Sequence, residues 1–169
     1  MNTTEAAVRE IDLLKEHERV IGRLYAAYAN RFPQERDFWL ALSQEEDQHA
    51  RWIESLQAKR EQERGVLIVN RFPIEAINHS IDYVNKLIDQ ADRADLTPIK
   101  ALSAALNLEQ ALLENRYFEV FASDSTEVRR VLEMLAQGTA AHVERVRRAW
   151  HESKQPPHSS ARAPSAPGT

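Results

Sequence analysis

The chain has 169 residues, of which 43% are hydrophobic and 28% charged, with only 4 glycines and no cysteine. These proportions are typical of one globular domain with a sizeable core, and the missing cysteines exclude disulfides, thiolate catalysis and cysteine-ligated metal clusters. The net charge of −4, with acids and bases interspersed, argues against nucleic-acid binding.

Helical periodicity covers nearly the whole chain up to about residue 152. Prolines in NRFPQE (from residue 30) and NRFPIE (from 70) stand where a helix would begin, and DLTP (from 95) and SDST (from 123) offer residues that cap helix N-termini. These breaks predict helices over 4–31, 34–62, 73–94, 97–122 and 125–152, and no sheet. Residues 1–153 form one predicted domain, and the Pro/Ser/Ala-rich residues 154–169 are predicted to be a disordered tail.

Four of the five predicted helices carry polar residues on the stripe that should face the core. These residues are Glu18 in the first helix, Glu46 and His49 in the second, Glu109 in the fourth, and Thr139 and His142 in the fifth. The stripe of the fourth helix reads Ile99, Leu102, Leu106, Glu109, Leu113 and Val120. The third helix has an uninterrupted apolar stripe, made of Ile74, Ile77, Ile81, Val84 and Ile88.

The interruptions fall at one depth, near the middle of each helix. Buried carboxylates are costly unless their charge is compensated, and three of them at one depth would repel one another. Carboxylate and imidazole ligands suit iron, manganese or zinc. The pattern therefore predicts a metal site formed by Glu18, Glu46, His49, Glu109 and His142.

Simpler explanations stay open for these residues: they pair with Arg19, Arg23 or Arg116, or they face solvent. Other titratable residues fit the stripes less well. We expect four histidines to lie outside the site, with His17 exposed: His17 and His79 are off the stripes, His151 is at a helix end and His158 is in the tail. Glu45 and Glu114 flank the stripes and are either surface residues, supports for a ligand or spare ligands, Glu114 being the further ligand candidate.

Four short motifs, in order, resemble the ferritin-like di-iron carboxylate proteins, and most closely their rubrerythrin-like branch. ERVIGRLYAAYA (from 18), EEDQHA (from 45), ALNLEQALLENRYFEVF (from 105) and LAQGTAAHVERV (from 135) are similar to the family's four helices. In that family two helices each give a glutamate and two each give Glu-x-x-His. The resemblance covers about residues 5–150 and implies an all-α, ferritin-like four-helix bundle, with the extra helix at 73–94 as the crossover.

The sequence departs from the family at Thr139, which stands where the second Glu-x-x-His would place its glutamate, three residues before His142. A threonine hydroxyl carries no charge and is a poor ligand. The family's four carboxylates are thereby reduced to three. Tyr25, seven residues after Glu18, is either a hydrogen-bond donor to the ligands or a plain core residue.

The resemblance implies iron as cofactor, as one or two ions, with manganese or zinc as alternatives. It also implies non-haem di-iron oxidoreductase or peroxidase chemistry on peroxide, dioxygen or ferrous iron. Without cysteine the chain has no iron–thiolate centre, so redox activity requires an external electron donor. The alternative is a degenerate bundle that serves as a binding or structural module without redox activity.

Partners and location are expected from the same features. We expect a homodimer with no nucleic-acid partner. The apolar run VLIV at 66–69, like every other apolar run of the chain, is far shorter than the about 20 residues of a membrane span. MNTTEAAVREIDLL is charged too early to resemble a secretory signal. The sequence therefore predicts a cytoplasmic protein that does not enter a membrane.

Overall fold

The computed structural model describes residues 3–63, 68–69, 74–114, 121–122 and 126–154. Most of them belong to α-helices, which confirms the all-α class. The helices are α1 (Thr3–Arg31), α2 (Arg36–Glu63), α3 (Ile74–Asp89), α4 (Pro98–Glu114) and α5 (Thr126–Ser153), with a short 3-10 helix, η1 (Pro33–Glu35), between α1 and α2. Within the described residues, no helix is both long enough and apolar enough to cross a membrane.

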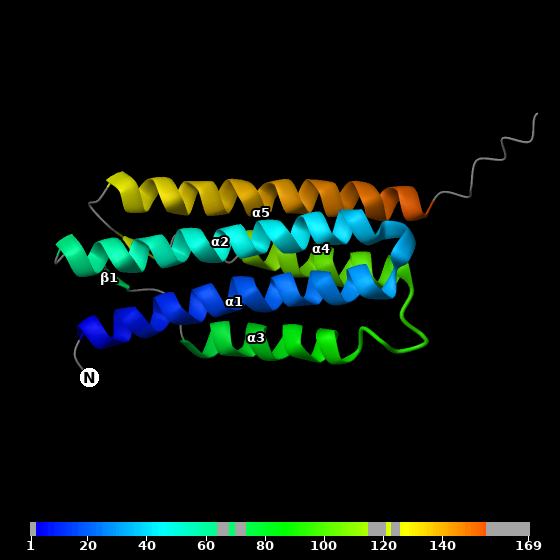
Figure 1. Ribbon diagram of the computed structural model, residues 1–169, viewed down its shortest axis with the longest axis horizontal. Coiled ribbons are helices and arrows are strands. Elements are labelled where there is room, and N and C mark those ends of the chain that lie inside the picture. Colours follow the sequence, from blue (N-terminus) through cyan, green and yellow to red (C-terminus); the bar gives the residue numbers. More distant parts are fainter. Residues whose placement is uncertain (1–2, 64–67, 70–73, 115–120, 123–125, 155–169) are drawn as a thin grey trace, which may run out of the picture.

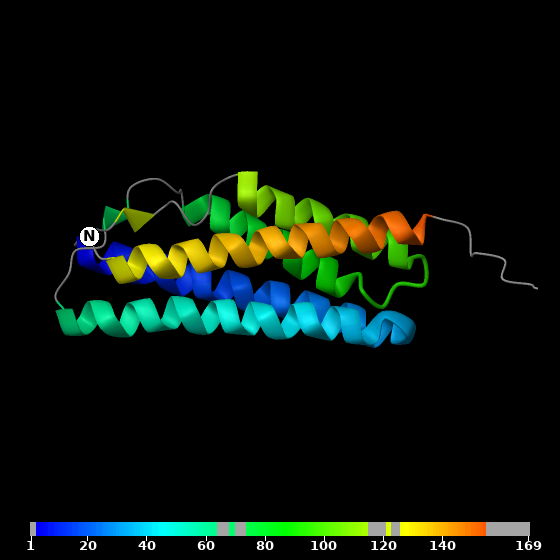
Figure 2. The same ribbon diagram turned by 90° about the horizontal axis from the view of Figure 1, so that it is seen from above.

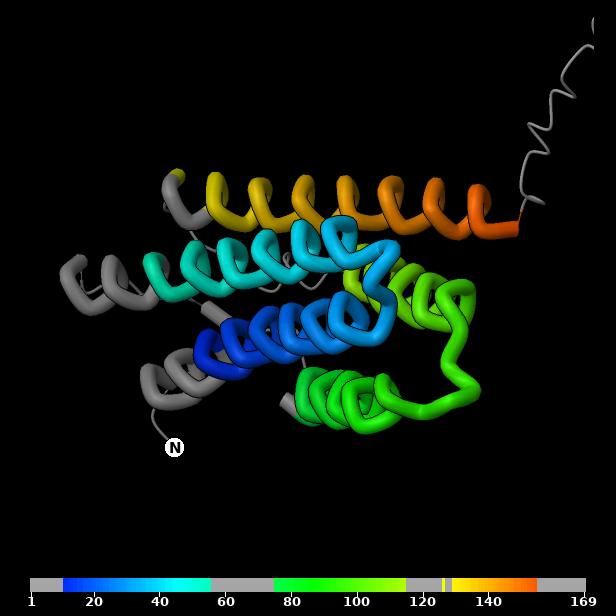
Figure 3. Tube along the Cα trace, turned by 45° about the vertical axis from the view of Figure 1, so that its right-hand side comes forward, coloured from blue at the N-terminus to red at the C-terminus, as the bar shows by residue number. Residues whose placement is uncertain are grey.

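The helices lie along one long axis (Figures 1 and 2). α1 and α2 form an antiparallel pair, α4 and α5 form a second, and the two pairs meet along α2 and α5. α3 packs on α1 and returns the chain to the end of the molecule where α4 begins (Figure 3). As a result α2 and α4 run in the same direction, starting from the same end of the molecule (Figure 2).

Two of the predicted helix boundaries are explained by local chemistry. The backbone N–H of Phe32 donates to Tyr28 O (2.9 Å), and Pro33 then begins η1, where its missing N–H costs nothing. Thr97 caps α4, because its Oγ1 accepts a hydrogen bond from the N–H of Lys100 (3.4 Å) and Pro98 occupies the first helical position. Pro73 and the SDS segment at 123–125 lie outside the described residues.

Two of the predicted helix ends were wrong. The helix predicted over 73–94 ends at Asp89, because the N–H of Ala91 donates to Ile88 O (2.9 Å), a tighter turn that does not continue the helix. The helix predicted over 97–122 ends at Glu114. Residues 121–122 instead form strand β2 (Phe121–Ala122), which pairs antiparallel with β1 (Ile68–Val69), so the expected absence of a sheet was also wrong. The predicted tail over 154–169 lies, apart from Lys154, outside the described residues.

α1 is buried on two faces because α2 and α3 pack against it from different sides. Toward α2, an aromatic cluster surrounds Trp39, with ring centroids at 5.8 Å from Tyr25, 5.0 Å from Tyr28 and 5.0 Å from Phe38. Such ring pairs stabilise a core beyond the area they bury. Tyr25 also contacts Glu109 of α4, so the cluster lies next to the polar residues of the predicted stripes.

The predicted stripe of α4 was rotated from the observed one. Leu102 and Glu109 are buried as expected, but Ile99, Leu106 and Leu113 are only partly buried. The buried face of α4 is completed by small residues and leucines at other positions, namely Ala101, Ala105, Leu108 and Leu112. Alanines let α4 approach its neighbours closely, which a reading based on large apolar residues does not detect.

Candidate metal centre

All five predicted ligands lie in one buried layer between the helix pairs. Their exposed fractions are 1% for Glu18 and Glu46, 3% for His49, and 0% for Glu109 and His142. They come from α1, α2, α4 and α5, which places one or two polar side chains from each helix at the same level. Contacts of 2.9–3.3 Å link the five side chains, so their predicted convergence is confirmed.

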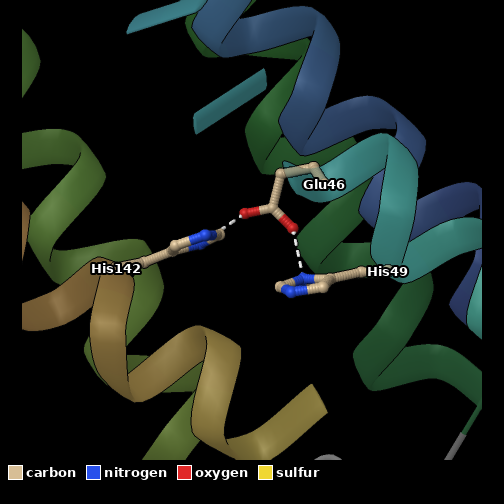
Figure 4. A group of neighbouring side chains, drawn as sticks. All are labelled: Glu46, His49 and His142. Carbon is tan, nitrogen blue, oxygen red and sulfur yellow. Dashed lines mark hydrogen bonds and ion pairs between the residues drawn. The ribbon is translucent and has the colours of Figure 1, made fainter. Parts of the chain in front are cut away.

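Glu46 lies at the centre of the layer, between the two imidazoles (Figure 4). The Nδ1–H of His49 donates to Glu46 Oε2 at 3.0 Å, and Nδ1 of His142 lies 2.9 Å from Glu46 Oε1. The two rings stack, with centroids 5.2 Å apart and planes inclined by 24°. One ligand atom from each of these three residues lies within 4.8 Å of the others, so the group can hold a metal ion.

A second carboxylate stands beside each imidazole. Glu18 Oε2 lies 3.3 Å from Nδ1 of His49, and Glu109 Oε1 lies 3.3 Å from Nδ1 of His142. We call Glu18, His49 and Glu46 Oε2 the His49 half, and Glu109, His142 and Glu46 Oε1 the His142 half. Thr139, 2% exposed, occupies the position on α5 that corresponds to Glu46 on α2.

Tyr25 belongs to both the core and the layer. Its side chain is fully buried against Trp39, and its hydroxyl donates a 2.5 Å hydrogen bond to Glu109 Oε1. Burial and the nearby charge of Glu109 hold the pKa of Tyr25 well above its usual value. The hydroxyl therefore keeps its proton and fixes one oxygen of Glu109.

Glu45 and Arg145 support His142 from outside the layer. The Nε2–H of His142 donates to Glu45 Oε2 at 2.9 Å, and Arg145 Nη1 donates to Glu45 Oε1 at 2.8 Å, with Nη2 bonded to the other oxygen. These bonds hold the ring so that Nδ1 faces Glu46 and Glu109. The sequence left the role of Glu45 open and missed Arg145, whose position three residues after His142 was the available signal.

Gly138 was also missed. A Cβ atom at this position would lie 2.3 Å from His49 Nε2, so only glycine lets the ring lie against α5. A glycine costs stability in the middle of a helix, and this one directly precedes Thr139 in a chain with 4 glycines. A glycine inside a helix, next to a polar residue on the buried stripe, was therefore a sequence signal that another side chain packs closely against the backbone there.

The layer attracts positive charge. Burial raises the pKa of Glu18 to about 7. Burial alone would lower the histidine pKa values, but the neighbouring carboxylates outweigh it and raise the pKa of His49 to about 9 and that of His142 to about 11. The three carboxylates thus stabilise cations placed between them, whether these are protons on the imidazoles or a metal ion in their place.

Several atoms of the layer have unused hydrogen-bonding capacity. Among the described residues, Glu18 Oε1, Glu46 Oε1, Glu109 Oε2 and His142 Nδ1 are buried without a hydrogen-bond partner. Buried polar atoms without partners are costly and call for an explanation such as an ion. Carboxylate oxygens with imidazole nitrogens form a donor set that iron, manganese and zinc all accept, so the residues fit the metals expected from the sequence.

Two of the simpler explanations find no support in the contacts. Arg19 lies 3.9 Å from Glu54, and Arg23 lies 2.9 Å from Glu16. In these ion pairs both arginines interact with surface acids and not with the carboxylates of the layer. Arg116 lies outside the described residues. All five candidates are buried, so they do not face solvent.

The other titratable candidates that the structure describes lie outside the layer, and this excludes Glu114 as the further ligand. His79 and His151 are exposed, Glu114 is exposed at the C-terminal end of α4, and His158 lies outside the described residues. His17, expected to be exposed, is 0% exposed, with Nε2 2.8 Å from Ser80 Oγ of α3. The prediction failed because α3 covers a second face of α1.

Comparison with known proteins adds nothing to this geometry: no model of a protein family, no curated protein and no solved structure matches the chain.

Proposed function

We propose that the chain is a metal-binding protein of the ferritin-like, rubrerythrin-like type, with non-haem iron chemistry on peroxide, dioxygen or ferrous iron. The observation that carries the proposal is the convergence of Glu18, Glu46, His49, Glu109 and His142 from four helices, with four of their buried atoms lacking hydrogen bonds. The parallel course of α2 and α4, with α3 between them in sequence, supports a four-helix bundle with a crossover helix.

Bound iron would supply the electron transfer to an oxidant, and the side chains would supply the site. Glu46 lies between the two histidines, where one carboxylate can serve both halves. Glu45 orients His142, and the Tyr25 hydroxyl orients Glu109. Burial of the layer excludes bulk water, which strengthens every electrostatic interaction within it. In this proposal the electrons come from an external donor and the working form is a homodimer.

Metal analysis tests the proposal most directly. The protein is produced with iron and manganese supplied, and bound metal is measured beside a His142→Ala variant made in the same way. We expect metal in the wild type, less in the variant, and a thermal midpoint that rises when iron is added to wild-type protein alone. Absence of metal from both proteins, with unchanged midpoints, would contradict the proposal.

The alternative is a degenerate bundle without redox activity, and two observations favour it. Thr139 cannot replace a carboxylate, and Glu46 holds His49 and His142 by hydrogen bonding and charge without any ion. In that case the layer is a structural ion-pair network, and removing metal would leave stability unchanged. The same metal analysis separates the two functions.

A further inference from the structure

The two halves of the layer contain the same residue types but differ in what their atoms already bind. We propose that they are unequal ion sites, and that the His142 half takes one tightly held divalent ion per chain while the His49 half does not bind a second of comparable affinity. This inference rests on the proposed metal-binding function and specifies which residues of the layer carry it.

Buried atoms without hydrogen bonds are distributed unequally between the two halves. Within the described residues, the His142 half has three of them: Glu46 Oε1, Glu109 Oε2 and Nδ1 of His142, which belong to α2, α4 and α5. Nδ1 of His142 and Glu46 Oε1 lie 2.9 Å apart as an ion pair, but they are not aligned as a hydrogen bond. An ion placed among these atoms would replace the proton on Nδ1 and no aligned hydrogen bond. The desolvation of each atom is already part of the folded state, so the ion gains interactions that the unaligned proton makes poorly.

The His49 half offers less. Nδ1 of His49 already donates to Glu18 Oε2 at 3.3 Å and to Glu46 Oε2 at 3.0 Å, and Glu18 Oε1 is the atom of this half that lacks a hydrogen bond. An ion here would have to replace both hydrogen bonds of the imidazole. Its net gain is therefore smaller than in the His142 half.

The imidazole of the His142 half is also held in one orientation. Nε2 of His142 is held by Glu45, which Arg145 holds in turn, so Nδ1 already faces the two carboxylates. Nδ1 lies 2.9 Å from Glu46 Oε1 and 3.3 Å from Glu109 Oε1. Atoms that share one metal ion, each bound at about 2.1 Å, lie a similar distance apart. The half therefore needs little rearrangement to bind an ion.

The charge of the layer also limits how many ions it can hold. The layer contains the carboxylates of Glu18, Glu46 and Glu109, whereas Thr139 contributes none. Two divalent ions would bring more positive charge than three carboxylates neutralise, in a place where burial makes uncompensated charge costly. One divalent ion leaves no such excess.

A matched pair of variants tests the inference. Glu109→Gln and Glu18→Gln each replace one carboxylate by an amide of the same size, one in each half. Titration calorimetry with Mn²⁺ at fixed pH should give one tight site in the wild type. We expect Glu109→Gln to weaken that site by about tenfold or more, and Glu18→Gln by less than about threefold, since losing a ligand or its support typically costs 10–100-fold.

The second pair is His142→Gln and His49→Gln, with the same order of effects expected, and circular dichroism checks that each variant folds. If a variant does not fold, the wild-type titration still decides, because two sites of similar affinity would overturn the inference. An equal or larger effect of Glu18→Gln or His49→Gln would overturn it too. A wild type that binds no Mn²⁺ or Fe²⁺ would overturn the proposed function itself, which is a distinguishable result.

Discussion

His17 and Glu18 are neighbours on α1 and equally buried, yet they face different surroundings. His17 faces α3, where it is hydrogen-bonded to Ser80, and burial lowers its pKa although the charge of Glu18 opposes the shift. Glu18 faces the layer between the helix pairs, where its carboxylate meets His49 and Glu46. Burial of a polar residue is therefore weak evidence of a ligand, and convergence of several from different helices is stronger.

The histidines extend the contrast. The pKa of His17 is lowered, whereas carboxylates raise the pKa of His49 to about 9 and that of His142 to about 11. The α1–α3 interface thus disfavours a cation on a buried histidine, and the layer favours one. Variants in these two regions should therefore differ in stability, metal binding and pH dependence.

The largest effect is expected from Glu46→Ala. Both imidazoles would lose the carboxylate between them, and breaking a buried ion pair costs about 3–5 kcal/mol of unfolding free energy. Metal binding should be lost as well. Urea denaturation without metal measures the first effect, and Glu45→Gln is the control, because its half-exposed ion pair should contribute only about 0–1 kcal/mol. If Glu46→Ala kept the stability and the metal content of the wild type, the layer would not differ from the α1–α3 interface as proposed.

Thr139→Glu should give a smaller loss of stability and a gain of metal. Without metal, an additional buried carboxylate should lower the unfolding free energy by about 1–3 kcal/mol. With iron, the fourth carboxylate should raise bound metal toward two ions per chain and speed up oxidation by dioxygen or peroxide. Thr139→Gln adds similar bulk without charge, so it should destabilise the protein without adding an ion. Equal metal content in all three proteins would contradict the role of charge.

The pH dependence should have opposite signs in the two regions. A raised histidine pKa contributes stability that is complete below the unfolded value of 6.5 and is lost as pH rises through the folded value, about 9 for His49 and about 11 for His142. The lowered pKa of His17 contributes stability above pH 6.5 that is lost as pH falls below it. Each group changes the unfolding free energy by at most about 1.4 kcal/mol per pH unit.

Differences between variants isolate these contributions in metal-free protein. The stability lost on His142→Gln should shrink between pH 6.5 and about 11, whereas the difference between wild type and His17→Gln should change only below pH 6.5. Metal affinity should rise with pH over the first range, because a ligating imidazole must give up its proton. Parallel pH profiles for the two variants would show that the histidines share one environment.

The sequence was sufficient for the layer because its residues share phase and depth on four helices. Glu18, Glu46, His49, Glu109 and His142 could each be read from 3-4 spacing, and the structure brings them together. The rotation of the α4 stripe did not prevent this, because Glu109 belongs to both the predicted and the observed buried face. The end of α4 was harder, since the β1–β2 pairing that follows it joins segments far apart in sequence.

The features that could not be predicted from the sequence depend on which helices pack against each other. His17 was misplaced because nothing in the periodicity of α1 says that α3 covers a second face. Arg145 and Glu45 meet across α2 and α5, and their pairing with His142 requires the two helices to be in register. Gly138 left a clearer signal, a glycine inside a helix next to an irregular position, but its partner His49 is 89 residues away in sequence.

The smallest effect is expected from Ser80→Ala, which tests whether α3 only packs. The substitution removes the 2.8 Å hydrogen bond to His17 at the α1–α3 interface and leaves the layer untouched. The loss of one buried hydrogen bond should lower the unfolding free energy by about 1 kcal/mol. Mn²⁺ affinity should equal that of the wild type, because His17 and Glu18 point to different sides of α1. Titration calorimetry with Mn²⁺ on Ser80→Ala and on Glu109→Gln compares the two affinities. A matching loss of affinity in both variants would mean that α3 sets the position of Glu18 through α1, and that the two buried regions act as one.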